Sequence, residues 1–336
     1  MLDISSVNVI DKSGMYKVYD RWPQIASDSY NNDNNPISYK NIDHIVFAGM
    51  GGSGAIGDLL AAILSKTNIH VSLVKGYHLP KTVDANTLVI PVSISGNTIE
   101  TLNVLNSARK LDCNLVAFSS GGKMEKYCKK NNLEFRKIQK IHSPRASFIG
   151  YVYSILDTLN SIIPIKKHDI SDSLIQLTKI SKQINSSNLT KKNPSVSLAE
   201  WLSGIPIIYY PWGLQAAAVR FKSSLQENAK SHAIIEDVVE ASHNGVVSWE
   251  RPSIVKPILL EGQDDYVKTK ERWLILKEYF KKNHIDYREV FSVKGSILAK
   301  LVCLVYLLDY VSIYYAILNK IDPSPVKSID FIKTNL

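Results

Sequence analysis

Short apolar runs that alternate with helical patterns constrain the fold of this chain more than any other feature of its sequence. The runs predict strands at residues 44–50, 71–74, 87–95 and 114–119 in the first half, and at 205–212, 253–260 and 287–293 in the second half. Helical periodicity predicts helices over residues 55–65, 98–110, near 214–225, 269–282 and 296–318. Strands that alternate with longer helices are typical of βαβ units and of a parallel sheet. Because the pattern occurs twice, the sequence predicts an α/β protein with two parallel-sheet domains.

Length and one polar segment locate the boundary between these domains. The chain has 336 residues, whereas an ordinary domain has about 100–200. Residues 166–196 begin with helical periodicity and continue into a stretch dense in Ser, Asn and Lys, which is typical of a linker. We therefore expect an N-terminal extension plus the first sheet domain over 1–165, a helical segment and linker over 166–196, and the second sheet domain over 197–336.

The segment before the first predicted strand, residues 1–40, belongs to neither sheet. It contains the sequence NNDNNP at 31–36, which is typical of a loop. We expect a helical extension here that covers a sheet edge or a partner.

Composition excludes several classes of protein. Hydrophobic residues make up 45% of the chain and charged residues 21%, as in globular proteins and unlike disordered or collagen-like chains. The three cysteines, Cys113, Cys128 and Cys303, lie far apart and form no C-x-x-C motif, so neither a disulfide framework nor a thiolate metal site is expected. Charges interrupt every apolar stretch of residues 1–25, so no signal peptide is expected there. We expect the protein to reside in the reducing cytoplasm.

Neither nucleic acid nor a membrane is an expected partner. The net charge of +9 comes from scattered lysines, with like-charge runs no longer than pairs such as Lys129-Lys130, whereas nucleic-acid-binding proteins cluster their basic residues. The surplus of positive charge also suits an anionic small substrate. Residues 301–318 are apolar enough to cross a bilayer, but Asp309 lies in their middle, where a carboxylate is unfavourable in lipid. This segment fits a buried helix of an α/β domain better.

A glycine-rich turn follows the first predicted strand. The sequence GMGGSG occupies residues 49–54 and leads into a predicted helix. Glycines let backbone N–H groups approach an anion at a helix N-terminus, where the helix dipole favours negative charge. The turn also matches the dinucleotide fingerprint G-x-G-x-x-G, but that fingerprint needs an acidic residue at the end of the second strand, and here that position is Lys75. A third interpretation is a turn whose glycines serve only close packing.

A hydroxyl-rich turn follows the third predicted strand. Ser93, Ser95 and Thr98 lie in the sequence SISGNT, with a helix beginning at the same point. One hydroxyl is expected to cap that helix, and all three could serve only as caps and turns. However, two such junctions at the carboxyl ends of strands in one sheet lie where these folds bind ligands. No G-x-S-x-G elbow surrounds the serines, so they are not predicted nucleophiles. The pattern favours donors to a phosphate.

Three further residues carry the functional groups of acid–base chemistry. Arg145, in the sequence SPRA at 143–146, precedes a predicted helix and offers a planar fork of donors to a phosphate or an enediolate. Glu227 and His243 lie 16 residues apart in a region expected to be a polar loop, which makes an acid–base couple plausible. Glu227 belongs to a run that contains Arg220, Lys222, Asn228 and Lys230, and Glu240 and Asn244 flank His243. Each of these residues, taken alone, is an ordinary surface or core group.

Two of these stretches resemble a known domain. The sequences FAGMGGSGAIGDLL (47–60) and PVSISGNTIETL (91–102) resemble the sugar isomerase (SIS) domain, a flavodoxin-like fold whose Ser- and Thr-rich loop binds the phosphate of a phosphosugar. With the later motifs, through DPSPVKSIDFIK (322–333), nearly the whole chain resembles the archaeal-type bifunctional phosphoglucose/phosphomannose isomerases. This resemblance implies two SIS domains, each a three-layer αβα sandwich, and a homodimer whose active sites are shared between subunits.

The resemblance also implies a role for individual residues. Glu227 is the base that moves the proton between C2 and C1, and His243, donated by the other subunit, opens the sugar ring. Arg145 stabilises the enediolate. The resemblance assigns phosphate and substrate binding to Gly52, Ser53, Ser93, Ser95 and Thr98.

Two C-terminal positions complete the implied site. The family commonly has threonine where this chain has Ser324, and that hydroxyl is associated with the acceptance of both C2 epimers. Serine keeps the donor but lacks the methyl group that restricts the rotamer. Lys333 is the candidate for the C-terminal lysine of the family's site.

We therefore expect reversible isomerisation of glucose 6-phosphate and fructose 6-phosphate, and of mannose 6-phosphate, through a cis-enediolate. No metal and no other cofactor is expected, because the eight histidines form no H-x-H or H-x-x-x-H cluster. Two alternatives stay open. A non-catalytic sugar-phosphate sensor would use both phosphate loops and leave Glu227 and His243 idle, and a nicotinamide-dependent dehydrogenase would explain only the glycine turn.

Overall fold

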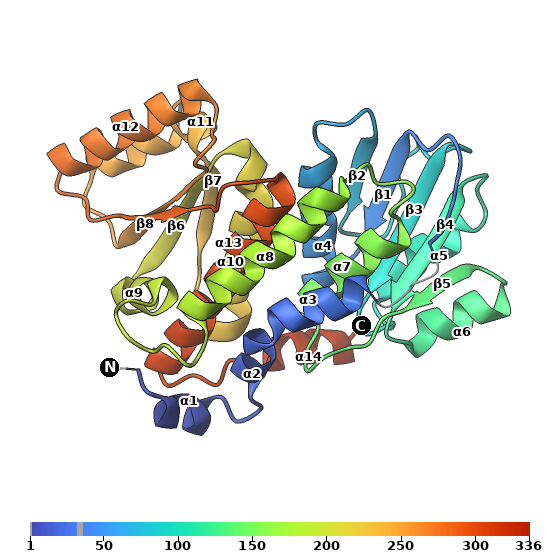
Figure 1. Ribbon diagram of the computed structural model, residues 1–336, viewed down its shortest axis with the longest axis horizontal. Helices are drawn as coiled ribbons and strands as arrows, with labels where there is room; N and C mark the ends of the chain where they lie inside the picture. The colour runs from blue at the N-terminus through green and yellow to red at the C-terminus, as the bar shows by residue number, and fades with distance from the viewer. Residues whose placement is uncertain (1, 32–35) are drawn as a thin grey trace. The chain divides into compact units, whose positions relative to one another are not determined.

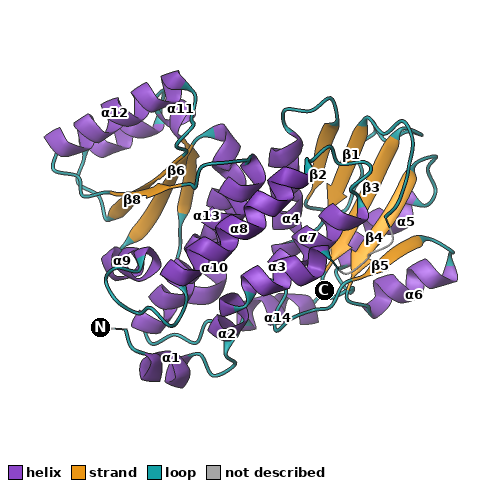
Figure 2. Ribbon diagram, in the orientation of Figure 1, coloured by secondary structure: helices purple, strands orange, loops and turns teal. Residues whose placement is uncertain are grey.

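The computed structural model describes residues 2–31 and 36–336, which form two compact units, each built around its own parallel sheet (Figure 1, Figure 2). One unit is Arg21–Leu174, and the other combines Met1–Asp20 with Ile175–Leu336. The two parallel-sheet domains expected from the sequence are confirmed. The predicted ranges 1–165, 166–196 and 197–336 follow a different division and stay a prediction. Of the predicted NNDNNP loop, residues 32–35 lie outside the described residues.

The sheet of the Arg21–Leu174 unit has five parallel strands in the order β2-β1-β3-β4-β5. The strands are β1 (His44–Ala48), β2 (His70–Val74), β3 (Thr87–Ser93), β4 (Asn114–Ser119) and β5 (Glu134–Lys137). β1 and β3 are buried along their whole length, as expected for inner strands that are covered on both faces. Since β1 pairs with β3 in parallel, the loops that follow these two strands emerge at the same edge of the sheet.

Helices cover both faces of this first sheet, so the predicted three-layer arrangement is confirmed. The helices that lie wholly within this unit are α3 (Trp22–Tyr30), α4 (Gly52–Leu64), α5 (Ile99–Ala108), α6 (Gly122–Lys130) and α7 (Phe148–Thr158). The α5 and α6 side chains Val104 and Met124 pack with Val46 on one face of β1. On the other face, α4 approaches β1 so closely that a Cβ at Gly57 would lie 3.0 Å from the Cβ of Phe47.

The second sheet has four parallel strands in the order β7-β6-β8-β9. They are β6 (Ile205–Tyr210), β7 (Ile234–Asp237), β8 (Val255–Glu261) and β9 (Arg288–Phe291). The remaining elements are α1 (Ile4–Ile10), α2 (Met15–Asp20), α8 (Lys167–Ile184), α9 (Pro194–Trp201), α10 (Gln215–Ala229), α11 (Val238–Ala241), α12 (Val267–Lys282), α13 (Ile297–Leu318), α14 (Lys327–Thr334) and the 3₁₀ helices η1 (Trp212–Leu214) and η2 (Gly245–Glu250). Side chains of α11 and α12 pack with Tyr209 and Leu259 on one face, while α10, which also packs on α13, contacts β6 and β7.

Helix α13 is the apolar segment with a carboxylate at its centre. It is long and apolar enough to cross a membrane, but 89% of its most apolar window is buried inside the protein. Asp309 is fully buried there. The expectation of a core helix is therefore confirmed for α13.

The N-terminal extension is helical, as predicted, and its described helices pack on other helices, while its expected cover of a sheet edge or a partner stays a prediction. Helices α1 and α2 contact α13, and α3 packs on α7. A hydrogen bond joins α2 to α13, because the Tyr306 hydroxyl of α13 donates to the backbone carbonyl of Tyr19 at 2.7 Å.

Candidate functional site

The predicted site residues fall into two groups, one in each unit. The Arg21–Leu174 unit holds Gly52, Ser53, Ser93, Ser95, Thr98 and Arg145, and the other unit holds Glu227, His243, Ser324 and Lys333.

The glycine turn between β1 and α4 leaves the start of the helix open to a ligand. Gly51, the N-cap residue, has a φ of +53° and no side chain that could cap the first N–H groups of α4. A Cβ at Gly54 would lie 2.8 Å from the carbonyl oxygen of Gly49, so a larger residue does not fit. The predicted start of this helix at residue 55 is wrong, because α4 already begins at Gly52. The glycines thus lie in the first turn, where helix N–H groups bind anions.

The hydroxyl-rich turn lies beside this glycine turn. Ser53, which is buried, accepts a hydrogen bond from the backbone N–H of Ile94 at 3.2 Å. This bond ties the first residues of α4 to the loop after β3. Two phosphate-binding candidates of the sequence are thereby brought together at one edge of the sheet.

The hydroxyls of this turn do not cap the following helix, contrary to expectation. Thr98 is the N-cap residue of α5, but its side chain accepts no hydrogen bond from the helix. Instead, Ser93 donates to Thr98 Oγ1 at 2.9 Å, and Ser95 Oγ accepts from the Asn97 N–H at 3.3 Å. Thr98 and Ser95 therefore each retain a hydroxyl proton, and the first N–H groups of α5 have no side-chain acceptor. Both features suit an incoming dianion.

The central residues of SISGNT have a structural role that the sequence did not reveal. Gly96 has a φ of +70°, and a Cβ there would lie 1.9 Å from the carbonyl oxygen of Gly121. Asn97 Oδ1 accepts a hydrogen bond from the N–H of Lys123 at 3.0 Å. This pair therefore fixes the turn against the loop between β4 and α6.

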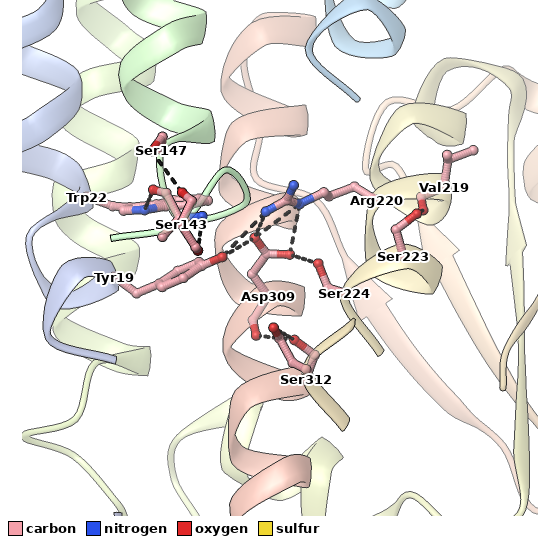
Figure 3. Close-up of polar contacts among 12 residues, drawn as sticks. Tyr19, Trp22, Ser143, Ser147, Val219, Arg220, Ser223, Ser224, Asp309 and Ser312 are labelled. Atoms are coloured by element: carbon pink, nitrogen blue, oxygen red, sulfur yellow. Dashed lines mark hydrogen bonds and ion pairs between the residues drawn. The ribbon is translucent and has the colours of Figure 1, made fainter. Parts of the chain in front are cut away.

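Arg145 lies against the start of α4. A Cβ at Gly52 would be 3.5 Å from Arg145 Cα, and the arginine is only 3% exposed. The loop is anchored on one side by Trp22, whose indole donates to the Ala146 carbonyl at 3.0 Å, and on the other by Ser147, which donates to the Ser143 carbonyl at 2.8 Å (Figure 3). The backbone of the loop that carries Arg145 is thus fixed beside the candidate anion site.

The end of β2 argues against dinucleotide binding. Lys75 forms an ion pair with Asp58 of α4 at 2.6 Å. Burial raises the pKa of Asp58, while Lys75 acts in the opposite direction. The position that would have to hold a ribose hydroxyl therefore carries a cation already engaged by a carboxylate.

Glu227 lies in a helix and not in the polar loop that was expected. Helix α10 continues to Ala229, four residues beyond its predicted end at 225, because its inner face packs on α13. Glu227 is half-buried in the last turn. Lys230 follows with a φ of 56° and donates to the Glu227 carbonyl at 2.6 Å and to the Asp322 carbonyl at 3.4 Å.

Ser324 lies in the turn that Lys230 contacts. Its backbone N–H donates to Asp322 Oδ1 at 2.9 Å. The side chain is half-buried. The structure therefore brings the end of α10 and the Ser324 turn together through one lysine.

His243 and Lys333 are both exposed. His243 lies between α11 and η2, and Lys333 lies in the last turn of α14. Within residues 2–31 and 36–336, neither side chain makes a hydrogen bond or an ion pair. The structure brings neither of them to Glu227, so their roles stay predictions.

Comparisons with known proteins agree with this division into two α/β units. The family model described as "SIS domain" matches residues 38–159, and the model described as "Bacterial phospho-glucose isomerase C-terminal SIS domain" matches residues 191–336. The first matched range contains both phosphate-loop candidates, and the second contains Glu227, His243, Ser324 and Lys333.

Two curated relatives match nearly the full length. The chain is 32% identical to a bifunctional phosphoglucose/phosphomannose isomerase of Caldicellulosiruptor bescii, over 89% of this chain and 91% of that protein. It is 31% identical to the protein of the same name from Aquifex aeolicus, over 96% of each chain. Among solved structures, tagatose-6-phosphate ketose/aldose isomerase from Escherichia coli has a TM-score of 0.70 at 13% identity, covering 94% of this chain and 96% of that one, which shows a shared fold.

Proposed function

The chain belongs to the bifunctional phosphoglucose/phosphomannose isomerase family, and from this membership we propose that it reversibly isomerises glucose 6-phosphate and fructose 6-phosphate, and mannose 6-phosphate and fructose 6-phosphate. The observation that carries the proposal is the pair of adjacent helix N-termini, those of α4 and α5, that no side chain caps. They provide a site for a phosphate dianion, which all three sugars share.

Phosphate binding is assigned to the turns after β1 and β3. The N–H groups of the first turns of α4 and α5 and the hydroxyls of Ser95 and Thr98 are the proposed donors. Ser53 and Ser93 hold these donors in place, because their hydroxyls form hydrogen bonds with the Ile94 N–H and with Thr98 Oγ1. Gly52 leaves room for the backbone beside Arg145.

The chemistry assigned to the remaining residues is a proton transfer without net oxidation. His243, donated by the partner subunit, opens the ring by moving the O1 hydroxyl proton to the ring oxygen, which leaves an aldehyde at C1. Glu227 then removes the proton from C2, the electrons form a C1–C2 double bond, and the carbonyl oxygen becomes an enediolate oxygen that Arg145 stabilises. The proton on O2 then passes to O1, and return of the C2 proton to C1 gives the ketose, with its carbonyl at C2 and a hydroxyl at C1. Lys333 is proposed as a further cation of this site.

A coupled assay tests the proposal directly. Fructose 6-phosphate is incubated with the protein in EDTA and without nicotinamide, and the glucose 6-phosphate formed is measured afterwards with a separate dehydrogenase. We expect turnover under these conditions. A binding signal without turnover would instead support a sensor, and turnover that needs nicotinamide in the first step would support a dehydrogenase.

The phosphate assignment predicts a KM effect. The double change Ser93→Ala and Ser95→Ala removes the direct donor Ser95 and the residue that fixes Thr98. Each lost hydrogen bond to a charged group costs about 1.5–3 kcal/mol, so KM for fructose 6-phosphate should rise about tenfold or more. Ser107→Ala, in the same helix α5 but far from its N-terminus, is the control. An unchanged KM in a folded double variant would remove both serines from the phosphate site.

The assignment of Ser324 predicts a change of selectivity. Serine can rotate where threonine is held by its methyl group, so Ser324→Thr should alter the ratio of mannose 6-phosphate to glucose 6-phosphate turnover. KM should stay nearly constant, because the donors to the phosphate are unchanged. Steady-state kinetics with both aldoses provide the measurement. Identical ratios in the two proteins would show that this hydroxyl does not sense the C2 configuration.

We further propose a cytoplasmic homodimer that acts in carbohydrate metabolism, in glycolysis and gluconeogenesis. One observation supports the shared site of a dimer, and another supports a reducing compartment. His243 is exposed and therefore accessible to a partner subunit. No disulfide joins the three cysteines among the described residues, and burial raises the pKa of Cys128 to about 11, which keeps that thiol protonated.

A further inference from the structure

Asp309, the carboxylate at the centre of the apolar helix α13, forms the centre of a buried polar network (Figure 3). Arg220 of α10 donates to it through Nη2 at 2.7 Å and through Nε at 3.2 Å. Ser224 donates to it at 2.5 Å and Tyr19 at 3.0 Å. Asp309 is 0% exposed and Arg220 is 2% exposed.

The positive charge of Arg220 is paired with the negative charge of Asp309. Burial alone would lower the pKa of the Arg220 guanidinium, but the adjacent Asp309 carboxylate more than offsets this effect and raises it. Arg220 therefore stays charged. A buried ion pair of this kind is weak evidence for a stabilising role, because the desolvation of two charges offsets much of their attraction.

The network continues toward the end of α10. Asn228 donates to Ser312 Oγ at 2.8 Å, and Ser312 donates to the Asp309 carbonyl at 2.6 Å. Arg220, Ser224 and Asn228 are spaced four residues apart, so they lie on one face of α10 and join it to α13 over two turns. The register and rotation of α10 are therefore fixed by directional bonds and not by apolar packing alone.

Glu227 is adjacent to this face. It precedes Asn228 directly and follows Ser224 by three residues, so any rotation or slide of α10 moves its carboxylate. Lys230 fixes the same turn from the other end through the Glu227 and Asp322 carbonyls. The last turn of α10 is thus held on both sides of Glu227.

We propose that the Asp309–Arg220–Ser224 network, extended by Ser312 and Asn228, consists of positioning residues that fix Glu227 for proton transfer. The inference rests on the proposed function and adds a requirement to it. A displacement of about 1 Å at a reacting group can lower a rate about 10²-fold. The network restricts such displacements because breaking it would leave a buried charge unpaired.

Asp309→Asn tests the proposal, with Ser223→Ala as the matched control. Ser223 is also in α10, but it donates only to the Val219 carbonyl, at 3.0 Å, within its own helix. In Asp309→Asn we expect kcat to fall about tenfold to 10²-fold while KM for fructose 6-phosphate changes less than about twofold. Ser223→Ala should retain both constants.

A second readout separates positioning from stability. A misplaced base makes proton abstraction more rate-limiting, so the primary isotope effect on kcat with glucose 6-phosphate deuterated at C2 should increase in Asp309→Asn. Replacing both charges, as in Arg220→Met with Asp309→Leu, removes the directional bonds made by these two side chains without leaving an unpaired charge, and such replacements often preserve stability. We expect this double variant to melt near the wild-type Tm and still show the lowered kcat and the larger isotope effect. The double variant therefore still tests the proposal if Asp309→Asn does not fold.

The outcomes distinguish this inference from the proposed function. If the wild type isomerises fructose 6-phosphate and Glu227→Gln abolishes turnover, but the folded double variant has the wild-type kcat and isotope effect, the positioning role is wrong and the proposed function stands. If the wild type does not turn over any of the three sugar phosphates, the proposed function fails and this inference fails with it.

Discussion

Replacing Glu227 with glutamine should reduce kcat by at least the 10²–10⁴-fold that is typical of a positioned general acid–base group. The loss should lie toward the upper end, because one carboxylate is assigned both the removal of the proton from C2 and its return to C1. Glutamine keeps the shape of the side chain and cannot accept the proton. KM should change little, since the proposed phosphate donors are untouched, and this pattern is that of an interaction made mainly in the transition state.

The neighbouring residue provides the control for this experiment. Gln226 precedes Glu227 in α10 and is exposed, so Gln226→Ala should retain the wild-type kcat. Binding of fructose 6-phosphate to Glu227→Gln, measured by calorimetry, shows whether the site is intact. If a folded Glu227→Gln protein retains more than about a tenth of the wild-type kcat, another group is the base.

Much of the architecture could be predicted because the inner strands of the first sheet are apolar along most of their length. β1, β3 and β4 are read directly from runs of buried residues. β5 and β7 could not be found in this way. Each is a four-residue strand at the edge of its sheet. Their sequences, EFRK and IIED, contain charged residues that obscure any apolar pattern. Neighbouring strands, and not local propensity, determine that they are strands.

The candidate phosphate site was predictable in position but not in detail. Glycines and hydroxyls at the ends of two paired strands indicate a ligand site from the sequence pattern alone. The direction of each hydroxyl depends on three-dimensional contacts, so the sequence did not indicate that Ser93 donates to Thr98 or that Thr98 leaves α5 uncapped.

The end of α10 shows a different limit of sequence reasoning. Arg220 and Asp309 are separated by 89 residues, and each alone reads as an isolated charge near an apolar stretch. Only the packing of α10 on α13 identifies them as a pair. The same packing explains why Glu227 lies in a helix, since the inner face of α10 bonds to α13 as far as Asn228.

His243→Gln should affect a different step from Glu227→Gln. If His243 opens the ring, the loss should be larger for the cyclic sugar than for the small fraction of open-chain substrate already in solution. Its exposed position between α11 and η2 is consistent with a residue that acts in the site of a partner subunit. Rapid-mixing kinetics that resolve the open-chain fraction from the cyclic sugar would measure the difference. Equal losses for both forms would argue against a ring-opening role.

Mixing the two inactive variants tests whether His243 acts across a dimer. A heterodimer of a Glu227→Gln subunit and a His243→Gln subunit would contain one site with both lesions and one site with neither, if each site takes its glutamate and its histidine from different subunits. After exchange, half of the dimers in an equal mixture should be heterodimers, so activity should return to about a quarter of the wild-type value, by the symmetry of a shared two-fold interface. Mass spectrometry of the intact dimers measures the extent of exchange. Complete exchange without recovered activity would place His243 and Glu227 of the same subunit in one site, because every site of the heterodimer would then carry one lesion.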